Sequence, residues 1–408
     1  MRHFIPEKWL KFSLFNLVIV ALLGVLMRYK IGFAFPYFDQ KYLQHAHSHF
    51  AFSGWITHTL FVLMVCFIQL YLSPPALRKY RFLLAANLVC AYGMLISFAV
   101  QGYAAVSIFF STASILIAYF FSFYFFKDLK QVEKQHPGNN WFKAALIFNV
   151  LSSFGTFALA YMMMTKNLPQ NAYLASVYYY LHFQYNGFFF FACMGLLYSQ
   201  LHQYLPNSGA NNTIFWLFAA ACVPAYFLST LWLNLPVWLY VLVVLAAAAQ
   251  VFAWVRFLQI IQQNLSQLKS KIQPVWQYLL LAVGFALSVK LILQLGSTIP
   301  EISKLAFGFR PIVIAYLHLV LLAIISVFLL VYLFSFNIIA TRKYSIKALI
   351  LFVFGVFLNE FILMVQGVAS FSYILIPYAN EALFAAALIM FLSMLALFIF
   401  QLKKTGAT

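Results

Sequence analysis

The chain is 408 residues long, 65% hydrophobic and 20% aromatic, and only 8% of its residues are Asp, Glu, Lys or Arg. Soluble domains carry about 25% charged residues, so this composition excludes a soluble domain, a disordered chain and a disulfide-stapled secreted protein. The net charge is +18, but the basic residues stand in short clusters between apolar runs, as the positive-inside rule predicts. The composition therefore indicates a polytopic membrane protein without a nucleic-acid partner.

Apolar runs of spanning length recur along the whole chain. A membrane-spanning helix needs about 20 mostly apolar residues. Twelve runs meet this need, at 10–28, 48–72, 82–102, 104–126, 142–164, 172–200, 213–233, 236–257, 275–295, 311–336, 346–369 and 381–402. We therefore expect an all-α fold, a single transmembrane domain over residues 1–408 made of about 12 helices. Pro224 lies inside the seventh run and should kink that helix.

Lysine and arginine are distributed unevenly over the connections between these runs. The richer set is Arg2, Lys8, Lys11, Arg78, Lys79, Arg81, Lys127, Lys130, Lys134, Arg256, Lys269, Lys271, Arg342, Lys343, Lys347, Lys403 and Lys404. The poorer set is Arg28, Lys30, Lys41, Lys166, Lys304 and Arg310. Because basic residues accumulate on the cytoplasmic side, both termini are predicted in the cytoplasm. Every even-numbered run then enters the membrane from outside.

Ionisable side chains inside a membrane are costly, which makes each of them a candidate functional residue. Six of the nine histidines lie at the head of run two, in run six and in run ten: His45, His47, His49, His58, His182 and His318. At a rise of 1.5 Å per residue, their positions place them in one layer in the outer half of the membrane. Neutral imidazole binds haem iron, copper and zinc, so the sequence predicts a haem or metal site in this layer.

The spacing of the histidines assigns them to helix faces. His45 and His49 are four residues apart and should share one face, and His47 and His58 are eleven apart, about three turns, and should share another. Each of these histidines can also have a role in which it binds no metal or haem. The triplet His45 to His49 can be a hydrated helix start, His318 can bond to a facing carbonyl, and His182 can belong to a polar network with its tyrosine, glutamine and asparagine neighbours.

Two further charges lie inside predicted spans. Lys290 in run nine and Glu360 in run eleven reach a similar depth in the predicted topology. An ion pair between them is the cheapest way to keep both charges in the membrane. The alternative is a role in proton relay, which buried carboxylates in membrane proteins often have.

The segment His47-Ser48-His49-Phe50-Ala51-Phe52-Ser53-Gly54-Trp55 resembles the span-two signature of subunit I of the haem-copper oxidase superfamily, which bears a low-spin haem ligand there. The superfamily includes cytochrome oxidases and nitric oxide reductases, and its topology of twelve spans with cytoplasmic termini is similar. In the family, span ten carries His-x-His; the matching triplet here is Tyr316-Leu317-His318, so the resemblance implies that only the low-spin ligand is retained. His182 matches a copper ligand of span six, but span seven lacks the family's two further histidines.

The resemblance implies one low-spin haem b, held by His318 and by one of His45, His47 and His49, with His49 preferred because it enters deepest. One histidine cannot hold a copper ion alone, so His182 does not imply a complete copper site. The haem propionates are expected to face a basic residue on the outer side, which means Arg28, Lys30, Lys41 or Arg310. The alternative is that these four side chains extend to lipid phosphates.

The function implied by the resemblance is that of a haem-binding redox protein in the bacterial inner (cytoplasmic) membrane. It would act in electron transfer, or as an oxidoreductase in divergent oxygen or nitric oxide chemistry. Membrane lipid and a periplasmic electron donor or other respiratory subunits would be its partners. Two alternatives remain: a non-catalytic haem or copper sensor or assembly protein, similar to a twelve-span group linked to nitric oxide stress, and a membrane transporter for a metal or solute.

Overall fold

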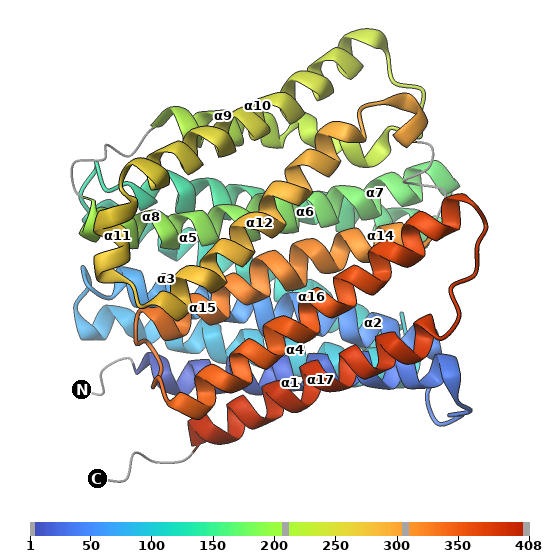
Figure 1. Ribbon diagram of the computed structural model, residues 1–408, viewed down its shortest axis with the longest axis horizontal. Coiled ribbons are helices and arrows are strands. Elements are labelled where there is room, and N and C mark those ends of the chain that lie inside the picture. Colours follow the sequence, from blue (N-terminus) through green and yellow to red (C-terminus); the bar gives the residue numbers. More distant parts are fainter. Residues whose placement is uncertain (1–4, 206–211, 304–309, 403–408) are drawn as a thin grey trace. The chain divides into compact units, whose positions relative to one another are not determined.

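The computed structural model describes residues 5–205, 212–303 and 310–402, and within these ranges every secondary-structure element is a helix (Figure 1). Ten helices are long and apolar enough to cross a membrane. The count rises to 11 if Asn212–Cys222 and Pro224–Thr230, which meet at a bend of 44°, form one span. The chain is therefore an all-α, multi-pass membrane protein, as the composition predicts.

One predicted span, the sixth run at 172–200, is not included in this count of 10 or 11 helices. The structure covers it with a helical run from α7 (Gln170–His182) through η4 (Phe183–Phe189) to α8 (Phe190–Tyr204). This run is not among the helices that meet the length and hydropathy criteria for a span. The count of twelve spans therefore stays a prediction.

The helices divide into two compact units. Unit 1 comprises residues 1–131 and 326–408, and unit 2 comprises residues 132–325. Unit 1 is therefore built from two separate stretches of the chain, whereas unit 2 is one continuous stretch. A single transmembrane domain over residues 1–408 stays a prediction.

Unit 1 contains the first and last helices of the chain. Its elements are α1 (Pro6–Gly32), α2 (Gln40–Phe50), η1 (Ala51–Thr57), α3 (His58–Ile68), η2 (Pro74–Leu77), α4 (Arg78–Gln101), α5 (Ala105–Asp128), η3 (Leu129–Gln131), α15 (Val327–Ser335), α16 (Lys343–Phe371) and α17 (Ala379–Leu402). Helix α17 packs against both α16 and α1, and α4 packs against α2 and α5. Helix α2 begins where Asp39 Oδ1 accepts hydrogen bonds from the backbone N–H groups of Lys41 and Tyr42, at 2.8 and 3.0 Å, which is the N-cap role typical of Asp.

Unit 2 holds the middle of the chain. Besides α7, η4 and α8, its elements are α6 (Gly138–Met164), α9 (Asn212–Cys222), η5 (Pro224–Thr230), α10 (Val237–Gln263), α11 (Leu265–Lys271), α12 (Pro274–Gly296), α14 (Arg310–His318) and η6 (Leu319–Ser326), whose last residue belongs to unit 1. Helix α6 packs against α7 and α8, and α10 packs against α9 and α12. The kink predicted at Pro224 is confirmed, because α9 ends at Cys222 and a 3₁₀ turn continues at an angle.

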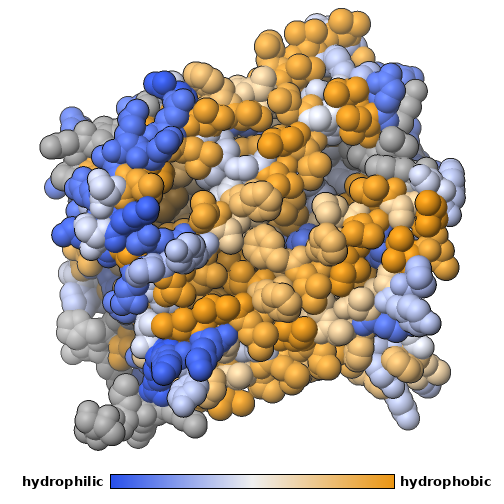
Figure 2. Space-filling view, viewed as in Figure 1, coloured by the Kyte–Doolittle hydropathy of each residue, from blue (hydrophilic) through white to orange (hydrophobic). Residues whose placement is uncertain are grey.

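The outward face of α16 shows the surface expected of a membrane helix. Figure 2 shows hydrophobic side chains over the visible face of this helix. Among the side chains of α16, Ile350, Phe354, Phe361 and Met364 are each about half exposed. Such a face suits the hydrocarbon of a bilayer, in which backbone groups are satisfied within the helix and side chains are apolar.

His136 stands just before α6, outside the spanning helices, and gives a prediction about acid sensitivity. Its ring lies 5.7 Å from that of His202. Burial, and then the neighbouring His202, lower the pKa of His136 below its ordinary value, while Glu133 acts in the opposite direction. The folded state therefore binds this proton less well than the unfolded state, so stability falls as the pH drops below about 6.5.

We expect the His136→Gln variant to lose less thermal stability than the parent protein between pH 7 and pH 5.5. The midpoint of thermal unfolding in detergent, measured over this range, tests the expectation. His202→Gln serves as the comparison. It should change the pH dependence of the unfolding midpoint less, since it removes the interaction with His202 but leaves His136 buried. Equal slopes for the parent and for His136→Gln would contradict the assignment.

Candidate functional site

Three histidines of the predicted spans, His49, His182 and His318, stand just before π-helical turns. The turn η1 begins two residues after His49, and η4 and η6 begin directly after His182 and His318. Within residues 5–205, 212–303 and 310–402 these are the three π-helical segments. Fewer than about 1% of residues in globular proteins are π-helical, and π turns occur frequently at functional sites. Their coincidence with histidines therefore marks these positions as candidate functional residues.

His45 and His49 share one face of α2, as their spacing predicts. The His49 ring stacks on Phe98 at a centroid distance of 4.2 Å, and its Nε2 lies 2.8 Å from the hydroxyl of Tyr103. The His45 ring meets the same tyrosine edge-on at 4.6 Å. The Nε2 atom of His49 is thus already held by a hydrogen bond to a side chain.

His47 and His58 face helix α1. His47 Nδ1 donates to the backbone carbonyl of Val20 at 3.1 Å. This bond fixes the tautomer, so the imidazole lone pair lies on Nε2. His58, at the far end of η1, is fully buried, and its ring lies 6.1 Å from that of Trp9. The backbone bond at His47 is the arrangement that typically orients a ligating histidine.

His318 shows the same kind of backbone bond. Its Nδ1 donates to the carbonyl of Ile314 at 2.9 Å, one turn earlier in α14. The alternative predicted from the sequence was a facing carbonyl, whereas this carbonyl belongs to the same helix as His318. This tautomer likewise places the lone pair on Nε2. His47 belongs to unit 1 and His318 to unit 2.

His182 lies in a buried polar network. Its Nε2 donates to the carbonyl of Cys222 at 2.8 Å, and its Nδ1 accepts from Asn186 Nδ2 at 3.2 Å. The Cys222 carbonyl is available because the helix breaks at Pro224: the N–H of Tyr226, its partner in a continuous helix, bonds to Val223 instead. The network alternative for His182 is what the structure shows, and its role as a metal ligand stays a prediction.

The sequence indicated Asn186 as a neighbour of His182, but not Cys222 or Lys290. The Cys222 thiol lies 4.0 Å from His182 Nε2, and Lys290 is close enough to interact electrostatically with both residues. The signal that could have found this cluster is the break at Pro224, which frees a carbonyl in the membrane. Among the described residues, no group of three or more His, Cys, Asp or Glu is placed to hold a metal ion.

Lys290 and Glu360 belong to different units, Lys290 to α12 of unit 2 and Glu360 to α16 of unit 1. The Glu360 carboxylate accepts a hydrogen bond from its neighbour Asn359 at 3.1 Å. Both the ion pair and the proton-relay role predicted for these residues stay predictions.

The basic residues expected beside haem propionates are described only in part. The Lys30 ammonium donates to the carbonyl of Phe35 and lies 5.8 Å from the centroid of the ring of that residue. The side chain of Arg310 lies outside the described residues. At Gly54 in span two, the Phe50 ring lies close to the backbone: a Cβ added there would lie 2.7 Å from that ring.

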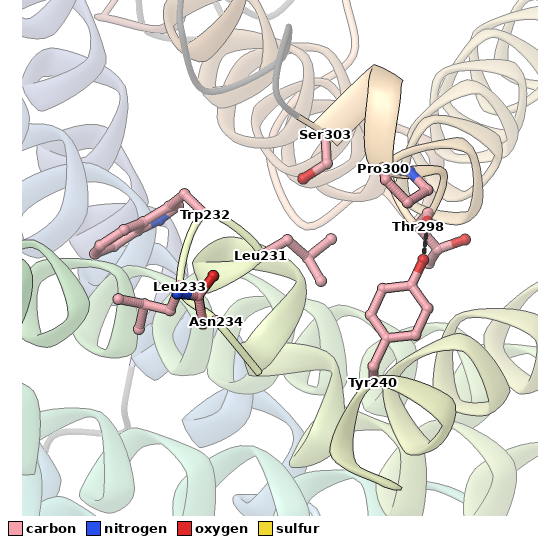
Figure 3. A pocket seen from close by; sticks show the side chains of 8 residues that line it. All are labelled: Leu231, Trp232, Leu233, Asn234, Tyr240, Thr298, Pro300 and Ser303. Carbon is pink, nitrogen blue, oxygen red and sulfur yellow. Dashed lines mark hydrogen bonds between the residues drawn. The ribbon is translucent and has the colours of Figure 1, made fainter. Parts of the chain in front are cut away.

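A pocket of about 350 Å³ lies in unit 2 (Figure 3). Its lining residues come from the loop before α10, from α10 itself and from the turn after α12: Leu231, Trp232, Leu233, Asn234, Tyr240, Thr298, Pro300 and Ser303. The hydroxyl of Tyr240 donates to the Thr298 carbonyl across it. The described residues that line it carry no imidazole, thiol or carboxylate, which are ligands typical of iron and copper sites.

A scan of the chain against models of known protein families finds no match, and no curated protein matches its sequence. The resemblance to haem-copper oxidases therefore stays a prediction from the short segments and from the predicted topology.

Proposed function

We propose that the protein is a membrane haem protein that carries one bis-histidine, low-spin haem b and acts in electron transfer. The observation that supports this most is the π turn that follows each histidine-bearing segment of the predicted spans. Two neutral imidazoles that fill both axial positions of the iron give a low-spin haem suited to electron transfer and not to gas binding. Haem supplies the one-electron chemistry, and the chain supplies the ligands and an apolar, aromatic environment.

We infer that His318 and His47 are the axial ligands. Each donates from Nδ1 to a backbone carbonyl, at 2.9 and 3.1 Å, and this bond orients the ring and raises the basicity of Nε2. His49, preferred from the sequence, has its Nε2 in a hydrogen bond with Tyr103. Haem ligation through Nε2 of His49 would break that bond.

An absorption spectrum of the purified protein, reduced with dithionite, tests this function. We expect the sharp α band of a six-coordinate haem b and one haem per chain by pyridine haemochrome assay. Carbon monoxide should leave the spectrum unchanged, because both axial positions are filled. A purified, folded protein without haem, or a haem that binds carbon monoxide stoichiometrically, would contradict the proposal.

We further propose twelve spans in the bacterial inner membrane with both termini in the cytoplasm, with membrane lipid around them and a periplasmic donor or other respiratory subunits as redox partners. The distribution of lysine and arginine supports this orientation. It predicts that Gln44→Cys, an exposed position at the start of α2, reacts with a membrane-impermeant maleimide in intact cells.

The matched variant for this topology is Lys134→Cys, an exposed position between α5 and α6. It should react only after the inner membrane is permeabilised. Reversed accessibility of the two positions would show that the orientation, and with it the outer location of the histidines, is wrong.

A further inference from the structure

Two buried asparagines bond to the backbone of the π turn in span two. Asn16 of α1 donates from Nδ2 to the Gly54 carbonyl at 2.6 Å, and Asn87 of α4 donates to the Ser53 carbonyl at 3.2 Å. The two side chains are 0% and 2% exposed. A buried amide without a partner is costly, above all within a membrane. The two helices beside η1 therefore each supply a hydrogen bond to adjacent carbonyls of the turn.

The direction of the Asn16 bond is determined by a third residue. The hydroxyl of Tyr92 donates to Asn16 Oδ1 at 2.6 Å. The amide oxygen of Asn16 is thus an acceptor, and its nitrogen must face the Gly54 carbonyl. Tyr92 lies on α4, as does Asn87, so α4 contributes to both bonds.

The π form of η1 decides which histidines face which helix. A π turn holds one residue more than an α turn, and one residue corresponds to about 100° of rotation at 3.6 residues per turn. Without the extra residue, α2 would be rotated by this angle relative to α3. His47 would then no longer face the Val20 carbonyl of α1 while His58 keeps its place beside Trp9. The two asparagines hold the turn at the point where this rotation is set.

We propose that Asn16 and Asn87 are positioning residues for the haem ligand of span two: they hold η1 in its π form and thereby aim the imidazole of His47. The inference rests on the proposed function, in which span two supplies an axial ligand. Neither asparagine is proposed to contact the haem. Each acts through the backbone of Ser53 or Gly54.

The test compares Asn16→Leu, Asn87→Leu and the double variant with the parent protein. Two readouts are measured: the g values of the oxidised low-spin haem by electron paramagnetic resonance, and the rate of haem loss to apomyoglobin. We expect changed g values, since the imidazole plane rotates. One lost hydrogen bond should make haem loss about fivefold faster, and both together should have a larger effect.

Two further variants keep the test informative. Tyr92→Phe is a mild change that frees the Asn16 amide to turn, and it should shift the g values in the same direction with haem loss about twofold faster. Asn149→Leu is the matched control: this asparagine is also buried, but its Oδ1 accepts from Gln184 in unit 2, at 2.9 Å. It should leave the g values unchanged.

The outcomes separate the two proposals. If the parent protein carries no low-spin haem, the proposed function fails and the positioning role fails with it. If the parent carries the haem but the asparagine and Tyr92 variants keep its g values and its rate of haem loss, the positioning role alone is wrong. If Asn149→Leu shifts the g values as much as Asn16→Leu does, the effect is a general loss of packing and the positioning role is likewise overturned.

Discussion

Replacement of His318 by alanine should abolish the low-spin haem spectrum of the purified protein. A haem that keeps one imidazole has an open axial position, so its iron becomes high-spin and binds carbon monoxide. The loss should be complete and not graded, because His318 is the one histidine of its predicted span. The absorption spectrum of the reduced protein, with and without carbon monoxide, measures the change.

Three companion variants locate the second ligand. His47→Ala should have the same effect as His318→Ala. His49→Ala and His182→Ala should leave the low-spin spectrum intact, since these rings are engaged by Tyr103 and by Cys222 with Asn186. A full bis-histidine spectrum in the His318 variant would refute the site. If His49→Ala loses the low-spin spectrum and His47→Ala retains it, His49 and not His47 is the second ligand.

Replacement of Gly155 by valine should strongly destabilise unit 2. A Cβ at this position of α6 would lie 2.6 Å from the carbonyl oxygen of Ser176 and 2.9 Å from the backbone nitrogen of Tyr180, both in α7. These are backbone atoms, which cannot swing aside as the end of a side chain can. The two helices would have to move apart, at a cost of about 3 kcal/mol or more by comparison with overpacked cores.

The free energy of unfolding in detergent, followed with denaturant, measures this effect. Gly284→Ala in α12 is the control, because a Cβ there meets only Trp254 at an ordinary 3.8 Å. It should be neutral or slightly stabilising, as a helix-interior glycine costs about 0.5–1 kcal/mol relative to alanine. Equal stabilities for the two variants would show that α6 and α7 are not in such close contact.

The helices themselves were predictable from the sequence, because each depends on local composition. The run at 346–369 corresponds to α16, and the run at 275–295 corresponds to α12. The kink at Pro224 was equally predictable, since it follows from a missing N–H group. A shared helix face was also predictable where two residues are close in the sequence: His45 and His49, four residues apart, both contact Tyr103.

The π turns were not predictable, because they depend on partners distant in the sequence. The turn η1 is held by Asn16 and Asn87, which lie 38 and 34 residues from the carbonyls that they bond. The partner of His182 was missed for the same reason, since Cys222 is 40 residues away.

The division of the chain has a consequence for the order in which the protein is assembled during synthesis. Unit 2 lies between the two stretches of unit 1, so the helices α1 to α5 enter the membrane long before α15 to α17 exist. The ribosome must add residues 132–325 in between, which takes roughly 10–40 s at 5–20 residues per second. During this time the faces of α1 that later contact α17 have only lipid or the insertion machinery as neighbours. The bond from the Trp55 indole to the Ser326 hydroxyl, at 2.8 Å and across 271 residues, can form only at the end of this interval. Nascent chains stopped before residue 326 should therefore already protect unit 2 from proteolysis while α1 remains accessible to it.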